Sequence, residues 1–349
     1  MRFFYLFLLI VFWTGCSFSE KKIDEYDIKV VNKTDITIDY TGLTYFNDNF
    51  YAYNYLQIER FDENGASDSL FQEPGEGPGE FRMVNSLGVY NGALVLSDFA
   101  LRRITFLGKD FNLLKTNLLP ETIVDDIKQI NDKLVFAGMK TLSDETEKKV
   151  SLATIFDIDE KFNLLNGKEI FNLDENLLKK LDNSKVFIDL GCSVCATSKD
   201  DIFLANPFLP FIFKYSIENE SVSRKKIEFK NYQNPFETNE QKVRKSSDMI
   251  AKGYDKLMSF YLVDRPVFSC FIEKYDVVVV QYAQAVQNLF KNNEPLYTLL
   301  VYDCDLNLKA EIHNNYKIFD YSKKNDYFIC KEANKDGDDK LIFTELVEK

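Results

Sequence analysis

Apolar and polar residues alternate along most of the chain in short runs, separated by turns rich in Asn, Asp and Gly. A typical unit, residues 91–116, reads NGALVLSDFALRRITFLGKDFNLLKT and holds three apolar runs of strand length. Alternation with a period of two residues predicts β-strands, and the turns between the runs predict antiparallel hairpins. The pair Asn91-Gly92, which stands between two such runs, is a strong signal for a tight hairpin.

This pattern recurs six times, in copies that begin near residues 48, 91, 132, 200, 276 and 326. Units of roughly 40 to 50 residues with four short strands are typical of propeller blades. The two longest intervals each contain a helix-like insertion, near residues 174–182 and 238–261. In the first insertion Asp174 is placed to cap the helix, and Leu177 lies on its apolar face.

These units predict an all-β fold: a six-bladed β-propeller with two short helical insertions, over residues 28–349. A closed ring buries both faces of every sheet and leaves only short edges exposed. The strand-like segment KVVNKTDITIDY, residues 29–40, precedes the first copy. We expect it to pair with the last blade, beside the chain end KLIFTELVEK, and so to close the ring.

One segment, FQEPGEGPGEF at residues 71–81, interrupts the pattern between the first two units. A phosphate-binding loop leads into a helix and commonly carries a Lys, whereas this segment carries three Glu and leads into a strand-like run. Gly adopts positive φ readily and Pro fixes φ, so we interpret the segment as a stiff turn between two blades. This structural interblade loop consists of Gly75, Gly77, Pro78, Gly79, Glu80 and Phe81, whose ring we expect in the seam between the blades.

The N-terminus has the form of a signal peptide, with Arg2 followed by an apolar run from Phe3 to Trp13. The sequence WTGC resembles the lipobox of bacterial lipoproteins, in which cleavage precedes the Cys and the Cys is lipidated, although Leu is usual where Trp13 stands. We therefore predict a signal peptide over residues 1–15, lipidation of Cys16 and a polar tether to residue 27. An ordinary secretion signal is the alternative. Several acyl chains would anchor the protein stably in a membrane. The N-terminus therefore predicts an extracytoplasmic, lipid-anchored protein of the cell envelope, located at the outer membrane.

The net charge of −12 argues against a nucleic-acid partner, because phosphate contacts need a basic field. His313 is the only histidine, so any catalytic triad or multi-His metal site would depend on it. Its neighbours, AEIHNNYK, suggest a surface turn instead. We interpret the five further cysteines as small apolar strand residues. Structural disulfides are the alternative, although five cysteines cannot all pair with one another. They are Cys192, Cys195, Cys270, Cys304 and Cys330.

The segment GEGPGEF, with VYNGALVLSD and RITFLGKDFNLL after it, resembles the bacterial six-bladed β-propeller lipoproteins, relatives of the NHL and TolB-like propellers. About forty residues carry the resemblance closely, and the other units match only as degenerate blades. The resemblance implies the propeller fold, an extracytoplasmic location and a binding function. It implies no settled reaction.

Five charged residues stand where the loops between strands should approach one face of the ring, and we take them as candidate ligand-binding residues: Asp98, Arg102, Arg103, Asp264 and Arg265. The two neighbouring arginines suit an anionic ligand, or an ion pair with Asp98.

Two main classes of function follow from these patterns, and a scaffold subunit of an envelope complex is a third option. The first is a membrane-anchored binding or interaction module for a peptide, protein or saccharide, which needs no cofactor. The alternative is a calcium-dependent lactonase or hydrolase, with groups such as Asp98, Asn206 and Asp264 around the metal in the central channel. The sequence singles out neither catalytic residues nor metal ligands.

Overall fold

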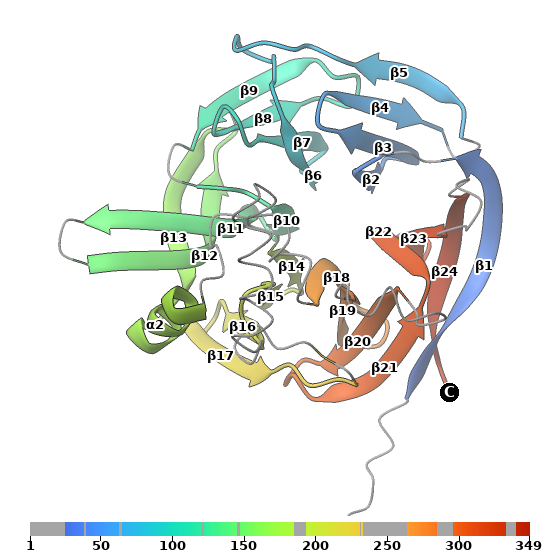
Figure 1. Ribbon diagram of the computed structural model, residues 1–349. Coiled ribbons are helices and arrows are strands. Elements are labelled where there is room, and N and C mark those ends of the chain that lie inside the picture. The colour runs from blue at the N-terminus through green and yellow to red at the C-terminus, as the bar shows by residue number, and fades with distance from the viewer. Residues whose placement is uncertain are drawn as a thin grey trace, which may run out of the picture.

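The computed structural model describes residues 25–37, 40–62, 65–119, 122–144, 147–184, 193–230, 232, 264–284, 296–332 and 340–349. In this part of the chain, six antiparallel sheets of four strands each stand as blades around a central axis (Figure 1). The prediction of an all-β, six-bladed propeller is therefore confirmed.

The blades follow one another along the chain. Blade 1 consists of β2 (Gly42–Phe46), β3 (Asn49–Asn54), β4 (Gln57–Phe61) and β5 (Ser67–Phe71). Blade 2 consists of β6 (Val84–Tyr90), β7 (Ala93–Asp98), β8 (Arg103–Leu107) and β9 (Leu113–Leu118). Blade 3 consists of β10 (Asp126–Ile130), β11 (Lys133–Asp144), β12 (Glu147–Ile158) and β13 (Leu164–Asn172).

The second half of the ring is built in the same way. Blade 4 consists of β14 (Val194–Thr197), β15 (Asp201–Ala205), β16 (Phe211–Ser216) and β17 (Ser221–Lys226). Blade 5 consists of β18 (Arg265–Ile272), β19 (Val277–Ala283), β20 (Tyr297–Asp303) and β21 (Leu308–Asn314). Blade 6 consists of β22 (Tyr316–Ser322), β23 (Tyr327–Glu332), β24 (Lys340–Glu348) and β1 (Tyr26–Thr37).

The copies located in the sequence begin at the turn between the first and second strands of each blade. In blade 2 this turn is Asn91-Gly92, with φ of 43° and 83°. Two successive residues with positive φ give the tight turn whose twist matches that of the flanking strands. The hairpin predicted at this pair is confirmed.

The chain ends close the ring. β1 pairs antiparallel with β24, from Tyr26 opposite Glu348 to Thr37 opposite Lys340 (Figure 1). This pairing confirms the predicted closure. β1 begins at Tyr26, three residues before the segment 29–40 expected from the sequence, and ends at Thr37. The ring of Tyr26 is buried edge-on against Tyr275, with 5.5 Å between the ring centroids. The predicted signal peptide and Cys16 lie outside the described residues.

The core of the described residues consists of six apolar clusters, one at each seam between neighbouring blades. Successive side chains of a strand point to opposite faces, so each strand serves two seams. On β19, for example, Val277 and Val279 pack toward blade 6 while Val278 and Val280 pack toward blade 4. This arrangement explains an uninterrupted run of valines in an antiparallel sheet.

The first helical insertion is confirmed as α2 (Glu175–Ser184). Asp174 caps it, since Oδ1 accepts the Leu177 amide at 2.9 Å, and Leu177 is buried in the seam between blades 3 and 4. The second insertion, near 238–261, lies outside the described residues. Within the described ranges, no helix has the length and apolar character needed to cross a bilayer.

Candidate functional site

The first strand of each blade borders the central channel (Figure 1). On β10, Ile127 and Ile130 are buried in the core, whereas Asp126, Lys128 and Gln129 are only half-buried. Charged and amide side chains therefore alternate with buried apolar residues along this channel strand.

Many of these polar side chains connect the first strand of one blade to the backbone of the next. A strand edge carries unpaired amide and carbonyl groups, and these contacts satisfy them. The contacts are Thr44 to the Leu87 carbonyl (2.9 Å), Asn85 to the Val124 carbonyl (2.6 Å), Thr197 to the Gln129 carbonyl (2.9 Å), the Cys195 amide to Asp126 (2.9 Å) and the Tyr45 amide to Asp320 (2.7 Å).

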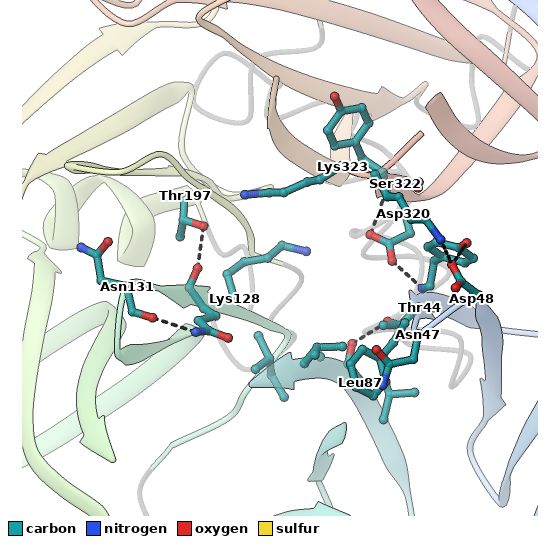
Figure 2. A pocket seen from close by; sticks show the side chains of 18 residues that line it. Thr44, Asn47, Asp48, Leu87, Lys128, Asn131, Thr197, Asp320, Ser322 and Lys323 are labelled. Carbon is teal, nitrogen blue, oxygen red and sulfur yellow. Dashed lines mark hydrogen bonds and ion pairs between the residues drawn. The ribbon is translucent and has the colours of Figure 1, made fainter. Parts of the chain in front are cut away.

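At one end the channel widens into a funnel of about 730 Å³ (Figure 2). Five of the six blades line it, and it opens where the turns after β2, β10 and β22 meet. The charged residues at its rim are paired: Lys324 with Asp48 at 2.5 Å, and Lys323 with Glu273 at 3.3 Å. The amines of Lys128 and Lys323 both point into the funnel.

A second cavity of about 120 Å³ lies deeper in the channel. Thr44, Leu87, Lys128 and Asp320 line both cavities, so they mark the constriction between them. The deeper chamber is also lined by Asp125, Asp126 and Lys317.

Lys128 and Asp320 at the constriction influence each other's charge. Burial disfavours the ammonium form of Lys128, but the carboxylates of Asp126 and Asp320 outweigh burial and raise its pKa above the ordinary lysine value. Lys128 Nζ lies 3.2 Å from Asp126 Oδ1. Burial raises the pKa of Asp320, an effect that Lys128 and the amides of Tyr45 and Tyr321 offset only in part.

Two other groups of the chamber titrate close to neutral pH. Burial raises the pKa of Asp125 to about 7, despite hydrogen bonds from the Ser193 amide and the Asn85 side chain. Burial, with the nearby charges of Lys331 and Arg265, lowers the pKa of Lys317 to about 8. Perturbed groups at the bottom of a cavity are a common mark of a functional site.

Three of the candidate residues from the sequence lie together in blade 2. Arg103 donates to the carbonyl oxygens of Glu76, at 2.9 Å, and Glu80, both in the segment 71–81 that contains the interblade loop. Asp98 accepts the Arg82 and Leu101 amides at 2.8 and 3.0 Å. The hydrogen bonds of Asp98 and Arg103 thus go to the backbone rather than to each other.

Arg102 and the remaining candidates do not join this group. The Arg102 guanidinium lies over the ring of Phe99, 5.4 Å from its centroid. Asp264 and Arg265 stand at the start of β18 in blade 5, across the ring from blade 2. Both sets lie at the end of their blades away from the funnel, so the structure does not bring the five residues into one site.

The interblade loop wraps around a carboxylate. The Gly77 amide donates to Glu80 Oε2 at 2.6 Å, and a side chain on Gly75 would meet the same oxygen. Gly79 has φ of 83°. Phe81 is 2% exposed and packs against Phe71 in the seam between blades 1 and 2.

Cys195, Cys270 and Cys330 are buried free thiols, as expected for apolar strand residues, and Cys304 is free and half-buried. Cys192 lies outside the described residues. His313 is exposed as expected, but the predicted turn is wrong. It belongs to β21, where its ring contacts Thr298 Oγ1 at 3.1 Å and Glu311 at 3.0 Å.

Asn206, the third residue considered for a calcium site, is buried in blade 4. Its side chain donates to Ser193 Oγ at 3.0 Å and accepts the Phe208 amide at 2.9 Å. Within the described part of the chain, no group of three or more His, Cys, Asp or Glu side chains is placed to hold a metal ion.

Sequence reasoning missed the residues of the constriction. The available signal was the position of charged residues just before each repeat turn, as in DIKQIND and FDYSKKND. Asp126 and Lys128 alternate there with a buried isoleucine, which is the pattern of a strand with one polar face.

The fold and the site therefore define the class of protein: a six-bladed propeller with a charged central channel. Its structure is similar to that of an exported protein of Bacteroides fragilis, with 14% identity over 93% of this chain and 96% of that one and a TM-score of 0.51. It is also similar to a member of the DUF4221 family from Bacteroides vulgatus, with 10% identity over 94% and 100% of the two chains and a TM-score of 0.59. At these identities the likeness shows the fold alone. No protein-family profile and no curated protein matches the sequence.

Proposed function

We propose that the protein is a lipid-anchored, extracytoplasmic binding module of the bacterial cell envelope, and that its ligand occupies the funnel of the central channel. The funnel carries this proposal. Its volume of about 730 Å³ lies within the usual range for sites that enclose a small ligand or the end of a larger one. Peptides, protein segments and saccharides are the ligand classes that the proposal covers.

The construction of the ring supports a preformed site. The funnel residues belong to strands that hydrogen-bond to a neighbouring blade: Thr44 of blade 1 contacts blade 2, and Thr197 of blade 4 contacts blade 3. Such a site loses little freedom when the ligand binds, which favours affinity.

The proposed location draws on the N-terminus. The signal-peptide pattern, the lipobox-like WTGC and the resemblance to propeller lipoproteins point outside the cytoplasm, and the structurally similar Bacteroides fragilis protein is named as exported. The anchor is tested by growing cells with labelled palmitate. We expect the wild-type chain and Cys304→Ala to incorporate the label and Cys16→Ala not to, whereas a labelled Cys16→Ala variant would contradict the assignment.

The funnel is tested by filling it. Lys323 points into the funnel from an exposed ion pair that contributes little to stability, so Lys323→Trp would place an indole in the cavity at small cost. The matched control is Lys225→Trp on the exposed outer strand β17. Binding to panels of peptides and oligosaccharides is measured by calorimetry on the full chain.

Ligands of the funnel should lose about tenfold or more in affinity with Lys323→Trp and bind Lys225→Trp as they bind wild type. The only Trp of the chain, Trp13, lies in the predicted signal peptide, so fluorescence of the new indole would also report binding. Ligands that bind both variants equally well would show that the funnel is not the site.

A further inference from the structure

The bottom of the funnel carries more negative than positive charge. Lys128 and Asp126 form a pair at 3.2 Å, and Asp320 faces the same constriction. In the described part of the chain Asp320 forms no ion pair, although it lies close enough to Lys128 for each to affect the other's pKa. Two carboxylates thus share one ammonium group at this depth.

Asp320 is held in a fixed orientation. Its Oδ2 accepts the Tyr45 amide at 2.7 Å and its Oδ1 accepts the Tyr321 amide at 2.8 Å. A carboxylate oxygen accepts more than one hydrogen bond, so both oxygens retain capacity for a donor. Figure 2 shows Asp320 on the wall of the funnel opposite Lys128, with open space between them.

Lys317 and Asp125 also line the chamber below the constriction. The Lys317 amine donates to the Thr41 carbonyl at 3.2 Å, and Lys128 is the cation that lowers the pKa of Asp320. At the rim, Lys324 is paired with Asp48 and Lys323 with Glu273. The raised pKa of Lys128 shows that the field around its amine is already negative. A further cation next to Asp320 would be stabilised, whereas an anion next to Lys128 would face two carboxylates.

We propose that the ligand is a peptide that inserts a primary ammonium group into the funnel, where Asp320 accepts its hydrogen bonds at the constriction. This inference rests on the proposed function of the funnel. Asp320 lies where the funnel meets the second cavity, and the small volume of that cavity, about 120 Å³, favours a slender, unbranched arm over a sugar ring. A lysine side chain and the free N-terminus of a peptide both present this group.

Lys128 should oppose this ligand. Its ammonium stands across the constriction from Asp320 and is attracted by both Asp126 and Asp320. It therefore repels a second cation that approaches the same two carboxylates. Removing the charge of Lys128 should therefore strengthen binding, whereas removing the charge of Asp320 should weaken it. A ligand that binds through a carboxylate or phosphate would give the opposite pair of changes.

The experiment uses the full chain in detergent and N-acetylated hexapeptide amides of Gly and Ser that carry one central residue: Lys, acetyl-lysine or Glu. A fourth peptide has a free N-terminus and no Lys, and a glucosamine trimer represents amino sugars. Calorimetry measures each with wild type, Asp320→Asn and Lys128→Met, and with Lys225→Met as the control. Thermal unfolding shows whether each variant is folded.

We expect the Lys or free-amine peptide to bind wild type at least about tenfold more tightly than the acetyl-lysine and Glu peptides. Asp320→Asn should cost a similar factor, Lys128→Met should gain affinity and Lys225→Met should change nothing. The comparison with acetyl-lysine decides the question on wild type alone if a variant does not fold.

If wild type prefers the Glu peptide and Lys128→Met no longer binds it, the ligand does not bind through an ammonium group. The funnel would remain the binding site. A glucosamine trimer that outcompetes every peptide would overturn the peptide assignment in the same way. Binding that neither channel variant alters would reject this inference together with the proposed function of the funnel.

Discussion

Arg102 and Arg103 are neighbours in the sequence with different surroundings in the structure. Arg103 is 7% exposed, and its guanidinium holds two carbonyl groups of the interblade loop. Arg102 is half-exposed over the ring of Phe99. One of the two is therefore tied to the packing of a loop, and the other makes a surface contact.

We expect Arg103→Ala to lower the free energy of unfolding by about 1.5–3 kcal/mol, because the carbonyls of Glu76 and Glu80 lose a charged donor. Arg102→Ala should cost about 0.5–1 kcal/mol, the magnitude of an exposed cation–π contact. Denaturation by urea measures both. Equal losses in the two variants would contradict the anchoring role of Arg103.

Asp125 makes stability depend on pH. Its pKa is raised to about 7 in the folded protein, against about 3.9 for an unfolded chain. The folded state therefore binds this proton more tightly. The resulting stability is fully present below about pH 4 and is lost as the pH rises through about 7.

Asp125→Asn should remove this dependence. From about pH 4 to about pH 7, wild type should lose stability relative to the variant, by at most about 1.4 kcal/mol per pH unit. Unfolding free energies measured across this range test the difference, with the exposed Asp200→Asn as the control. If the gap between wild type and Asp125→Asn stays constant with pH, Asp125 is not the group responsible.

Among the elements, β4 of blade 1 is tied to blade 2 by Arg60. This guanidinium contacts Asp68 on β5 at 2.7 Å and reaches Asp110 at 2.8 Å and the Lys109 carbonyl at 2.9 Å in the turn after β8. Its side chain is 17% exposed. Hydrogen bonds to Asp68 and Asp110 raise its pKa further above the ordinary arginine range.

Arg60→Met should cost about 1–3 kcal/mol, because the hydrocarbon part is retained while three charged or carbonyl acceptors lose their donor. Arg82 provides the comparison, since its ion pair with Glu76 is 58% exposed on the arginine side. Arg82→Met should cost less than about 1 kcal/mol. Chemical denaturation of both variants measures the difference, and similar costs would show that Arg60 does not join the blades.

The strands that follow the channel strand in each blade were predictable from the sequence, whereas the channel strands themselves were less so. A strand such as β7 is buried on both faces and reads as a clear apolar run. In contrast, β10 mixes charged and apolar residues because one of its faces borders the channel. The repeats found in the sequence consequently begin one strand late, at the turn that follows each channel strand.

At the scale of the molecule, the number of blades and the closing strand followed from local patterns, whereas the funnel did not. Asp320 and Tyr45 are 275 residues apart, and only ring closure brings them together. Nothing near either residue marks this contact. The candidate residues taken from loops instead lie at the far end of the blades, because a local pattern does not tell which end of the ring carries a cavity.

Ring closure itself is the last feature open to test, through a covalent link between the chain ends. Lys29 on β1 and Glu345 on β24 stand opposite each other, and their exposed ion pair at 3.7 Å contributes little. Cysteines at directly opposite positions have a spacing that suits a disulfide. The double variant Lys29→Cys with Glu345→Cys should form this bond under oxidising conditions and gain about 3–5 kcal/mol, because the link restricts a very long loop in the unfolded chain. Thermal unfolding with and without a reductant measures the gain, and Lys29→Cys alone should show none. A double variant that stays reduced, or that is no more stable when oxidised, would mean that β1 does not close the propeller.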